Sequence, residues 1–345
     1  MALKAGAIRF NTDISQMEIW DGNQWTGILA TSPELQTGGT RMLVMGGIKG
    51  GSGPRSDRID AIEISTTGDA TDFGDLVGGA DIFAASSCSS RVAAFRMGGG
   101  TPSPRNDIGK SIFASKGDEV DTGGDLSQNL VYSKGLSDST RGLVVGGYVP
   151  DTGINTIEFF TMTSNGSTVD FGDVHHAAST TFTVFASPTR GIIANGSTPS
   201  SPTGVNNISF ITISTTGNSA DFGDVSDPRS SCLGSSNAVR GLILGGGDTS
   251  GGGGVNTIEF VTIASLGDAT DFGDLTYTSN RDGASGASAT RSILSAGGDP
   301  FASPYGKVNN IDYGQIMSTG NAIDFGDLTE SKNHMEGSTN GHGGL

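Results

Sequence analysis

The chain has 345 residues, of which 56 are glycine, and its 36 acidic residues against 20 basic ones give a formal net charge of −16 at pH 7. Glycine is poor in helices and useful in turns, so this composition excludes a mainly helical protein and predicts an all-β one. A surface this acidic repels phosphate backbones, and no apolar run approaches the roughly 18 residues of a membrane helix. We therefore expect neither nucleic-acid binding nor membrane insertion.

Residues 1–40 differ in character from the rest of the chain and contain both tryptophans. Arg9 stands where a secretory signal peptide would be purely apolar, so we expect synthesis in the cytoplasm without a signal peptide. The alternation of apolar and polar residues predicts three short strands, at residues 7–12, 17–21 and 24–28. Because so small a module cannot bury enough apolar surface alone, we expect it to pack against itself in an oligomer, against the rest of the chain or into a larger assembly, and thus to serve attachment or oligomerisation. The residues expected to make these contacts are Phe10, Met17, Trp20 and Trp25.

From residue 41 onward the chain repeats with a period of about fifty residues. Each copy opens at an arginine with a strand that ends in small residues, as in RGLVVGG at residues 141–147. The arginines are spaced by 50, 50, 49, 50 and 51 residues, which indicates six copies of one structural unit. They are Arg41, Arg91, Arg141, Arg190, Arg240 and Arg291.

Each copy continues in the same way. A loop rich in Gly, Pro and Ser leads to a second alternating strand, such as VNTIEF at residues 255–260. A glycine turn follows, and then an Asp-Phe-Gly-Asp motif, in which Thr122 replaces the phenylalanine of the second copy. We expect these phenylalanines to anchor the core between neighbouring units. They are Phe73, Phe171, Phe222, Phe272 and Phe325.

Four short strands per unit, repeated six times, predict a six-bladed β-propeller. Residues 334–341 resemble the first strand of a unit, and we expect them to pair beside residues 41–47 and close the ring. The expected domains are an N-terminal β module, 1–40, and a propeller, 41–345, with repeats that start at residues 41, 91, 141, 190, 240 and 291.

The repeats resemble a known family. Residues 281–298 resemble a kelch repeat, whose second strand ends in paired glycines, and VNNIDY at residues 308–313 matches the third kelch strand. The resemblance covers residues 41–345, although the phenylalanine of Asp-Phe-Gly-Asp replaces the family's later tryptophan. It implies a kelch-like β-propeller and says little about chemistry, because kelch propellers serve many functions.

The N-terminal segment carries a second resemblance. Residues 6–26 are similar to a module of the form G-x-I-R-[FY]-N-T…[LM]-E-x-[WY]-D-G-x-x-W at the start of tailed-bacteriophage tail and fibre proteins, with any tryptophan-bearing hairpin as the alternative. The acidic, glycine-rich repeats also resemble those of phage structural proteins. The resemblance implies a virion protein that contacts other virion proteins through residues 1–40. By analogy with fibres, it implies a homo-oligomer, most simply a trimer.

Few residues suggest chemistry. Asp-Phe-Gly occurs in protein kinases, but five copies without the other kinase motifs exclude that function. Asp69, Asp72 and Asp75 could ligate Ca²⁺, yet their spacing lacks the pattern of a calcium loop and favours solvated turns. Cys88 and Cys232 are too few for a disulfide framework or a four-thiolate zinc site, and we expect both to be free thiols. The sequence predicts no metal, no other cofactor and no enzymatic activity.

A binding surface is the remaining expectation. The loops after the paired glycines vary most, and repeat loops on one face usually carry recognition. They are residues 48–58, 101–109, 148–153, 197–204, 247–254 and 299–307. Tyr148, Phe301 and Tyr305 are the aromatic residues expected to contact a host-surface glycan or protein, with packing on a neighbouring blade as the alternative.

The function expected is therefore that of a tail fibre or receptor-binding protein. The alternatives are a capsid decoration, a collar or nozzle component, and a polysaccharide-acting enzyme, since paired carboxylates for glycoside hydrolysis occur readily in so acidic a chain.

Overall fold

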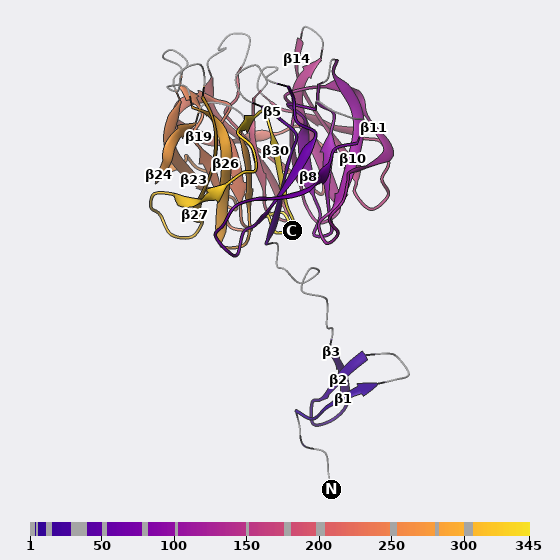
Figure 1. Cartoon of the computed structure of the whole chain (residues 1–345). Coiled ribbons are helices and arrows are strands. Elements are labelled where there is room, and N and C mark those ends of the chain that lie inside the picture. Colours follow the sequence, from indigo (N-terminus) through magenta and orange to yellow (C-terminus); the bar gives the residue numbers. More distant parts are fainter. Residues whose placement is uncertain are drawn as a thin grey trace. The chain divides into compact units, whose positions relative to one another are not determined.

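The computed structural model describes residues 4, 6–11, 16–28, 40–49, 54–77, 82–100, 103–149, 152–175, 181–197, 204–248, 254–279, 283–299 and 306–345. Within these ranges the chain is all-β, as the composition predicts (Figure 1). It divides into two compact units, Met1–Thr37 and Gly38–Leu345. The described residues include no helix that is long and apolar enough to cross a membrane.

The first unit contains one antiparallel sheet of three strands in the order β1-β2-β3. The strands are β1 (Ile8–Asn11), β2 (Gln16–Trp20) and β3 (Trp25–Ile28). The turn between β2 and β3 depends on Asp21, whose Oδ1 accepts hydrogen bonds from the backbone N–H groups of Asn23 (2.7 Å) and Gln24 (2.8 Å). These bonds stabilise the carboxylate and lower the pKa of Asp21 below its ordinary value.

The second unit contains six larger antiparallel sheets among its described residues. Sheet 1 consists of β30 (Glu336–Thr339), β4 (Arg41–Met45), β6 (Arg58–Glu63) and β7 (Thr71–Asp75). Sheet 2 consists of β8 (Ser86–Ser89), β9 (Ala93–Met97), β10 (Arg105–Ile112) and β11 (Val120–Leu130). Sheet 3 consists of β12 (Lys134–Ser137), β13 (Arg141–Val149), β14 (Thr152–Thr161) and β15 (Val169–Asp173).

The remaining three sheets follow the same plan. Sheet 4 consists of β16 (Thr183–Ala186), β17 (Arg190–Ala194), β18 (Val205–Thr212), β19 (Ala220–Ser230) and the short β22 (Gly247–Asp248). Sheet 5 consists of β20 (Leu233–Ser236), β21 (Arg240–Leu244), β23 (Val255–Thr262) and β24 (Thr270–Ser279). Sheet 6 consists of β25 (Ala284–Ala287), β26 (Arg291–Asp299), β27 (Gly306–Gln315) and β28 (Ile323–Asp327).

The chain's last strand completes its first large sheet. β30 pairs antiparallel with β4, from Glu336 opposite Met45 to Thr339 opposite Met42. This confirms the pairing predicted for residues 334–341. Nearby, β29 (Lys332–Asn333) pairs with β5 (Ile48–Lys49).

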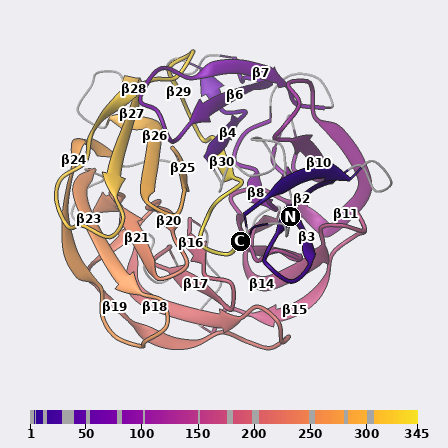
Figure 2. The ribbon, with the colours of Figure 1, turned by 90° about the horizontal axis from the view of Figure 1, so that it is seen from below.

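The first-named strand of each sheet is its inner strand. The inner strands of consecutive sheets contact one another: β30 with β8, β8 with β12, β12 with β16, β16 with β20, β20 with β25, and β25 with β30. Seen from below, the sheets lie around a common centre (Figure 2). The structure is therefore an all-β assembly of four-stranded sheets, consistent with a β-propeller-like fold.

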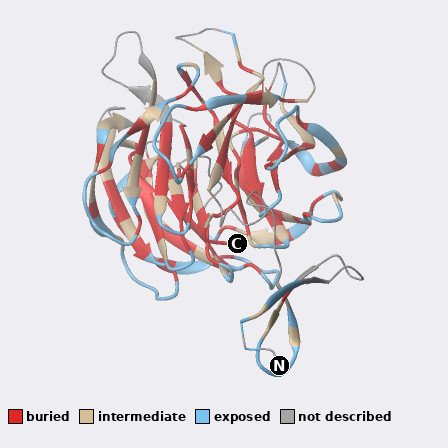
Figure 3. Cartoon of the chain, turned by 60° about the horizontal axis from the view of Figure 1, so that its bottom comes forward, coloured by how far each residue is buried: buried red, intermediate tan, exposed pale blue. Residues whose placement is uncertain are grey.

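The hydrophobic core lies between neighbouring sheets, where the buried residues follow the strands (Figure 3). One cluster, for example, joins Val44 and Ile62 of sheet 1 to Ile293 and Ile311 of sheet 6. The phenylalanines of the Asp-Phe-Gly-Asp motifs lie in these clusters, and each is at most 4% exposed.

The Asp-Phe-Gly-Asp motif also links the outer strands of neighbouring sheets through the backbone. The N–H of the turn glycine Gly267 donates to the carbonyl of Phe222 (2.9 Å), and the N–H of Ala269 donates to that of Asp224 (2.8 Å). A Cβ atom on Gly223 would lie 2.5 Å from the carbonyl oxygen of Gly267. The motif therefore needs its glycine, because the next sheet's turn packs directly on it.

Gly223→Ala is expected to lower the free energy of unfolding by about 2–3 kcal/mol, because the methyl group meets backbone that cannot yield. Thermal and urea unfolding measure this loss. Gly217→Ala is the matched control: both glycines have φ of +153°, but a Cβ on Gly217 meets nothing within 4 Å. Equal losses in the two variants would show that backbone conformation, and not contact between sheets, requires the glycine.

The repeat arginines form a second link between sheets. Arg141 Nη1 donates to the carbonyl of Ile213 in the next sheet (2.8 Å), and its guanidinium lies 4.8 Å from the ring centre of Phe159 in its own sheet. Arg41, Arg190, Arg240 and Arg291 donate to carbonyls of the following sheet in the same way. Five of the six arginines that mark the repeats in the sequence thus join their own sheet to the next one; Arg91 is exposed and lies before β9 begins at Ala93.

Candidate functional site

Five of the six inner strands have a described residue two positions before their first residue, and in each case its backbone is left-handed. The residues concerned, here called the collar, are Ala84 (φ 51°), Tyr132 (57°), Thr181 (62°), Ser231 (56°) and His334 (55°). The corresponding residue 282 lies outside the described residues. A left-handed conformation costs a non-glycine residue about 1–2 kcal/mol, and such strain tends to occur at functional sites.

Backbone hydrogen bonds hold the collar together. The N–H of Ala84 donates to the carbonyl of His334 (3.1 Å), that of Tyr132 to Ala84 (2.8 Å), and that of Ser231 to Thr181 (3.3 Å). The left-handed turn directs each N–H sideways to the neighbouring sheet. The strain is thus offset by bonds that fix where the inner strands begin.

Three aromatic side chains from consecutive sheets meet at the collar. The ring centres of Tyr132 and His334 are 5.9 Å apart, and Phe83 lies 6.3 Å from Tyr132 and 6.2 Å from His334, all edge to face. The guanidinium of Arg55 lies 4.5 Å from the Phe83 ring centre. All four side chains are half-buried, so their exposed parts form the surface of this end of the inner strands.

A small cavity of about 50 Å³, here called the ion-pair cavity, is lined by residues of the inner strands. Its lining includes Lys134 of sheet 3 and Glu336 of sheet 1, whose Nζ and Oε1 atoms are 2.8 Å apart. The two side chains are 11% and 13% exposed. They directly follow the collar, since each lies two residues after Tyr132 or His334.

A second cavity of about 70 Å³, the serine cavity, is lined by residues of all six inner strands. Its hydroxyl groups bond to carbonyls of neighbouring sheets: Ser137 Oγ donates to Ser89 O, Ser89 Oγ to Thr339 O, and Thr339 Oγ1 to Ala287 O, each at 2.8 Å. Small hydroxyl residues let the inner strands approach closely while their polar groups stay bonded.

The C-terminal residues lie against the serine cavity at the far end of the inner strands. His342 Nε2 lies 3.1 Å from the carbonyl oxygen of Ser89, and the N–H of Gly344 donates to His342 Nδ1 (3.1 Å). The N–H of Gly343 donates to Ser236 O (2.8 Å). These partners assign a neutral imidazole protonated on Nε2. Burial lowers the pKa of His342 to about 4.

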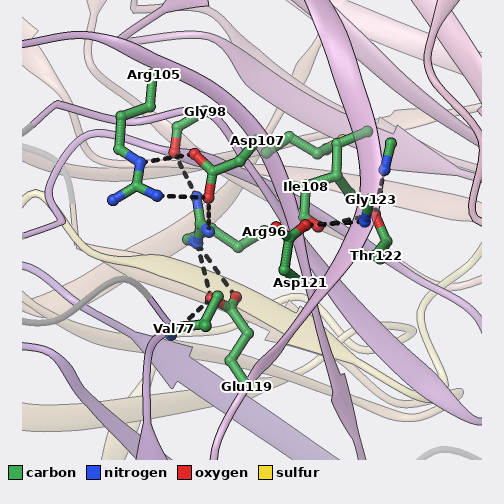
Figure 4. A network of polar contacts seen from close by, with 12 residues as sticks. Val77, Arg96, Gly98, Arg105, Asp107, Ile108, Glu119, Asp121, Thr122 and Gly123 are labelled. Carbon is green, nitrogen blue, oxygen red and sulfur yellow. Dashed lines mark hydrogen bonds and ion pairs between the residues drawn. The ribbon is translucent and has the colours of Figure 1, made fainter.

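A buried network in sheet 2 is another candidate (Figure 4). Arg96, whose side chain is fully buried, donates to both carboxylate oxygens of Glu119 (3.1 Å), to Asp107 (2.7 Å) and to Gly98 O (2.7 Å). Burial raises the pKa of Glu119 above its ordinary value, whereas for Asp107 the ion pairs with Arg96 and Arg105 outweigh burial and lower it.

This network contains a bond that recurs between all six large sheets, but its acceptor stands at a different place in the chain. In each sheet a buried side chain accepts a hydrogen bond from a residue of the preceding sheet. That donor residue stands two positions after the preceding sheet's Asp-Phe-Gly-Asp motif or its counterpart. The pairs are Val77–Glu119, Ser127–Glu158, His175–Ser219, Ser226–Glu259, Thr276–Asp312 and Thr329–Asp60. The acceptor stands on the third strand in four sheets. Sheet 2 has Gly109 there, and Glu119 fills the space that a Cβ on Gly109 would occupy. The network is therefore a structural junction.

The residues that the sequence predicts for attachment and recognition do not form one site in the described structure. Trp20 and Trp25 face each other across β2 and β3 with ring centres 5.6 Å apart, and both are half-buried. Phe10 and Met17 lie in β1 and β2, but their side chains lie outside the described residues, as do Phe301 and Tyr305 entirely. Tyr148 is 37% exposed and pairs with Val131, next to Tyr132 of the collar.

The expectation of a loop at residues 148–153 is wrong. β13 continues to Val149 and β14 begins at Thr152, so the described residues on both sides of this segment belong to paired strands. The loop expected at residues 101–109 is wrong in the same way, because β10 begins at Arg105. The paired glycines Gly146 and Gly147 have positive φ and produce a register shift, after which the strand goes on. They form a bulge within a continuing strand, whereas the sequence pattern predicts that the strand ends at these glycines.

The structure also places the carboxylates considered as calcium ligands and the two cysteines. Asp69 Oδ1 accepts the N–H of Asp327 (3.1 Å), whereas Asp72 lies 3.7 Å from both Arg58 and Lys116, so these carboxylates serve different partners. In the described ranges no group of three or more His, Cys, Asp or Glu residues is placed to hold a metal ion. Cys88 and Cys232 are free and buried, as predicted, and burial raises the pKa of both thiols.

The collar and the ion-pair cavity escaped the sequence-based reasoning. Their only signal in the sequence is position: the collar residues stand two residues before the inner strands, and Lys134 and Glu336 stand at the start of theirs. The residue types at the collar do not by themselves predict a left-handed backbone. Together they offer ring faces, an ion pair and hydroxyl groups, a set suited to holding a polar molecule. Comparison with protein-family models and with curated proteins found no match to this chain.

Proposed function

We propose that this chain is a virion protein of a tailed bacteriophage, acting as a tail fibre or receptor-binding protein. Its N-terminal unit attaches to other virion proteins and to further copies of the chain. Its larger unit is a closed, six-bladed, kelch-like β-propeller that presents one end to the host surface. The role is binding, without catalysis. The observation that carries the proposal is the division into a minimal N-terminal sheet and a large, internally bonded assembly with a strained collar.

The contacts between the last and first large sheets support a closed ring. The N–H groups of Gly68 and Ala70 in sheet 1 donate to the carbonyls of Phe325 (2.9 Å) and Asp327 (2.8 Å) in sheet 6. These bonds are the same as those between sheets 4 and 5. In addition, Arg291 of sheet 6 donates to Ile64 O of sheet 1 (2.9 Å), as Arg41, Arg141, Arg190 and Arg240 do with their following sheets.

The exposed apolar surface of the N-terminal sheet supports an attachment role. Ile8 is 58% exposed, and the tryptophan pair is only half-buried. A single three-stranded sheet of this size gains too little from burial to be stable by itself. Association with a partner would cover these side chains, and a homotrimer is the arrangement that the fibre resemblance favours.

The experiment uses the particles encoded by the same genome as this chain. An antiserum against the chain is expected to label their tails, and the purified full-length protein is expected to reduce particle adsorption to host cells. Removing residues 1–37 is expected to abolish oligomerisation and incorporation into particles while changing the melting temperature of the larger unit by less than about 2 °C.

Trp20→Ala in the full chain is the finer version of this experiment and should weaken self-association, measured by analytical ultracentrifugation. Absence of the chain from purified particles would overturn the proposal. Labelling on the capsid or neck, without any effect on adsorption, would overturn the receptor-binding part.

A further inference from the structure

We propose that the collar and the ion-pair cavity bind the terminal residue of a saccharide chain. The inference rests on the proposed function, because it names what the propeller would recognise on a host surface. The sugar ring would pack on the half-buried ring of Tyr132, beside His334, and its hydroxyl groups would reach Lys134 and Glu336.

The aromatic rings supply the apolar part of such a site. Tyr132 and His334 lie next to each other at the collar, and Phe83 contacts both of them edge to face. A sugar ring has an apolar C–H face that packs on aromatic rings and a polar rim of hydroxyls. Binding sites for such molecules combine aromatic walls with a few well-placed polar groups.

The ion pair supplies the polar part. An ammonium group donates hydrogen bonds and a carboxylate accepts them, and a sugar hydroxyl does both. Lys134 and Glu336, 2.8 Å apart and nearly buried, therefore present complementary partners for two neighbouring hydroxyls. Their opposite charges also keep this spot near neutrality in a chain whose net charge is −16, so a charged or neutral sugar can approach.

The size and rigidity of the place favour a sugar over a protein segment. A cavity of about 50 Å³ admits the hydroxyl edge of one sugar ring but not a helix or strand. The collar residues are fixed by left-handed backbone and by bonds to neighbouring sheets, so the groups are held before a ligand arrives. Such preorganised groups fit the end of a glycan chain.

The test is binding of the full-length protein to an array of defined mono- and oligosaccharides, followed by titration of the positive sugars by calorimetry. We expect at least one saccharide to bind with a Kd in the micromolar to millimolar range. Glu336→Gln and, separately, Tyr132→Ala are expected to weaken it at least about tenfold, because the first removes the charged acceptor and its ion pair with Lys134 and the second removes the aromatic ring. Glu63→Gln, the same chemical change at an exposed site in sheet 1, is expected to leave binding unchanged.

Melting temperatures within a few degrees of the wild type show that each variant is folded. If Glu336→Gln is not folded, Tyr132→Ala alone provides the test. The inference is overturned if no saccharide on the array binds at about 10 mM, or if both variants bind as the wild type does. It is also overturned if the purified Glu336→Gln and Tyr132→Ala proteins inhibit adsorption fully; the proposed function then stands, with a host protein as the receptor. If the chain is missing from the particles but binds a sugar through Glu336, the proposed function is overturned and the saccharide site stands.

Discussion

A variant that lacks residues 334–345 is expected to lose about 5 kcal/mol or more of folding free energy, which is comparable to the whole stability of many domains. The deletion removes β30, the inner strand of sheet 1, and with it Met335, which is fully buried in the core between sheets 1 and 6. Loss of a buried methionine alone costs about 2–5 kcal/mol. Ser338 Oγ and Thr339 Oγ1 also bond to carbonyls of sheets 2 and 6. Thermal unfolding by circular dichroism should show a fall of roughly 10 °C or more.

The control is a shorter deletion, of residues 341–345, which keeps β30 and removes only the segment at the serine cavity. It is expected to cost about 1–3 kcal/mol, the scale of a few hydrogen bonds. An unchanged melting temperature in the longer deletion would show that sheet 1 is stable without its inner strand, and the ring-closing role of β30 would then be wrong.

The free energy of unfolding is expected to fall as the pH falls from about 6.5 to about 4, because of His342. Its folded-state pKa of about 4 lies below the ordinary value of 6.5. The unfolded chain therefore binds a proton in this window that the folded protein excludes, and the folded state loses up to about 3 kcal/mol. Burial is the largest cause, and Arg91 lowers the pKa further, whereas the bond to Ser89 O and the nearby Asp138 raise it.

His342→Gln removes the titrating group and keeps a polar side chain of similar reach. Urea unfolding of both proteins at several pH values between 4 and 7 measures the effect. The difference in stability between wild type and variant should narrow or reverse as the pH falls, and should be constant above about 6.5. A difference that stays the same across the whole range would show that His342 titrates normally and is not held neutral.

The repeating parts of the fold could be predicted from the sequence. The period of fifty residues, the alternating strands and the C-terminal strand beside β4 all follow from side-chain patterns that the chain itself repeats. The glycine of Asp-Phe-Gly-Asp also stands out in the sequence, although its reason, the packed turn of the next sheet, appears only in the structure.

The candidate site could not be predicted, because contacts between sheets determine it. Nothing in the identities of Ala84, Tyr132 or Thr181 indicates a left-handed backbone, which arises where one inner strand starts beside its neighbour. The pairing of Lys134 with Glu336 joins residues 202 positions apart. The sequence does not predict the strands around Tyr148 for a related reason, since paired glycines are compatible with a bulge as well as with a strand end.

The exchange of a buried acceptor in sheet 2 bears on how the chain arose. Each repeat contains the side chain that receives the hydrogen bond from the repeat before it, whether that side chain stands on the third strand, as Glu259 does, or after the turn, as Glu119 does. A gene segment copied as one unit therefore arrives with its half of the junction complete. Arg96, Gly109 and Glu119 fall inside a single repeat, and the donor in the neighbouring repeat is the backbone N–H of Val77, so this repeat can change its acceptor without any change in its neighbour.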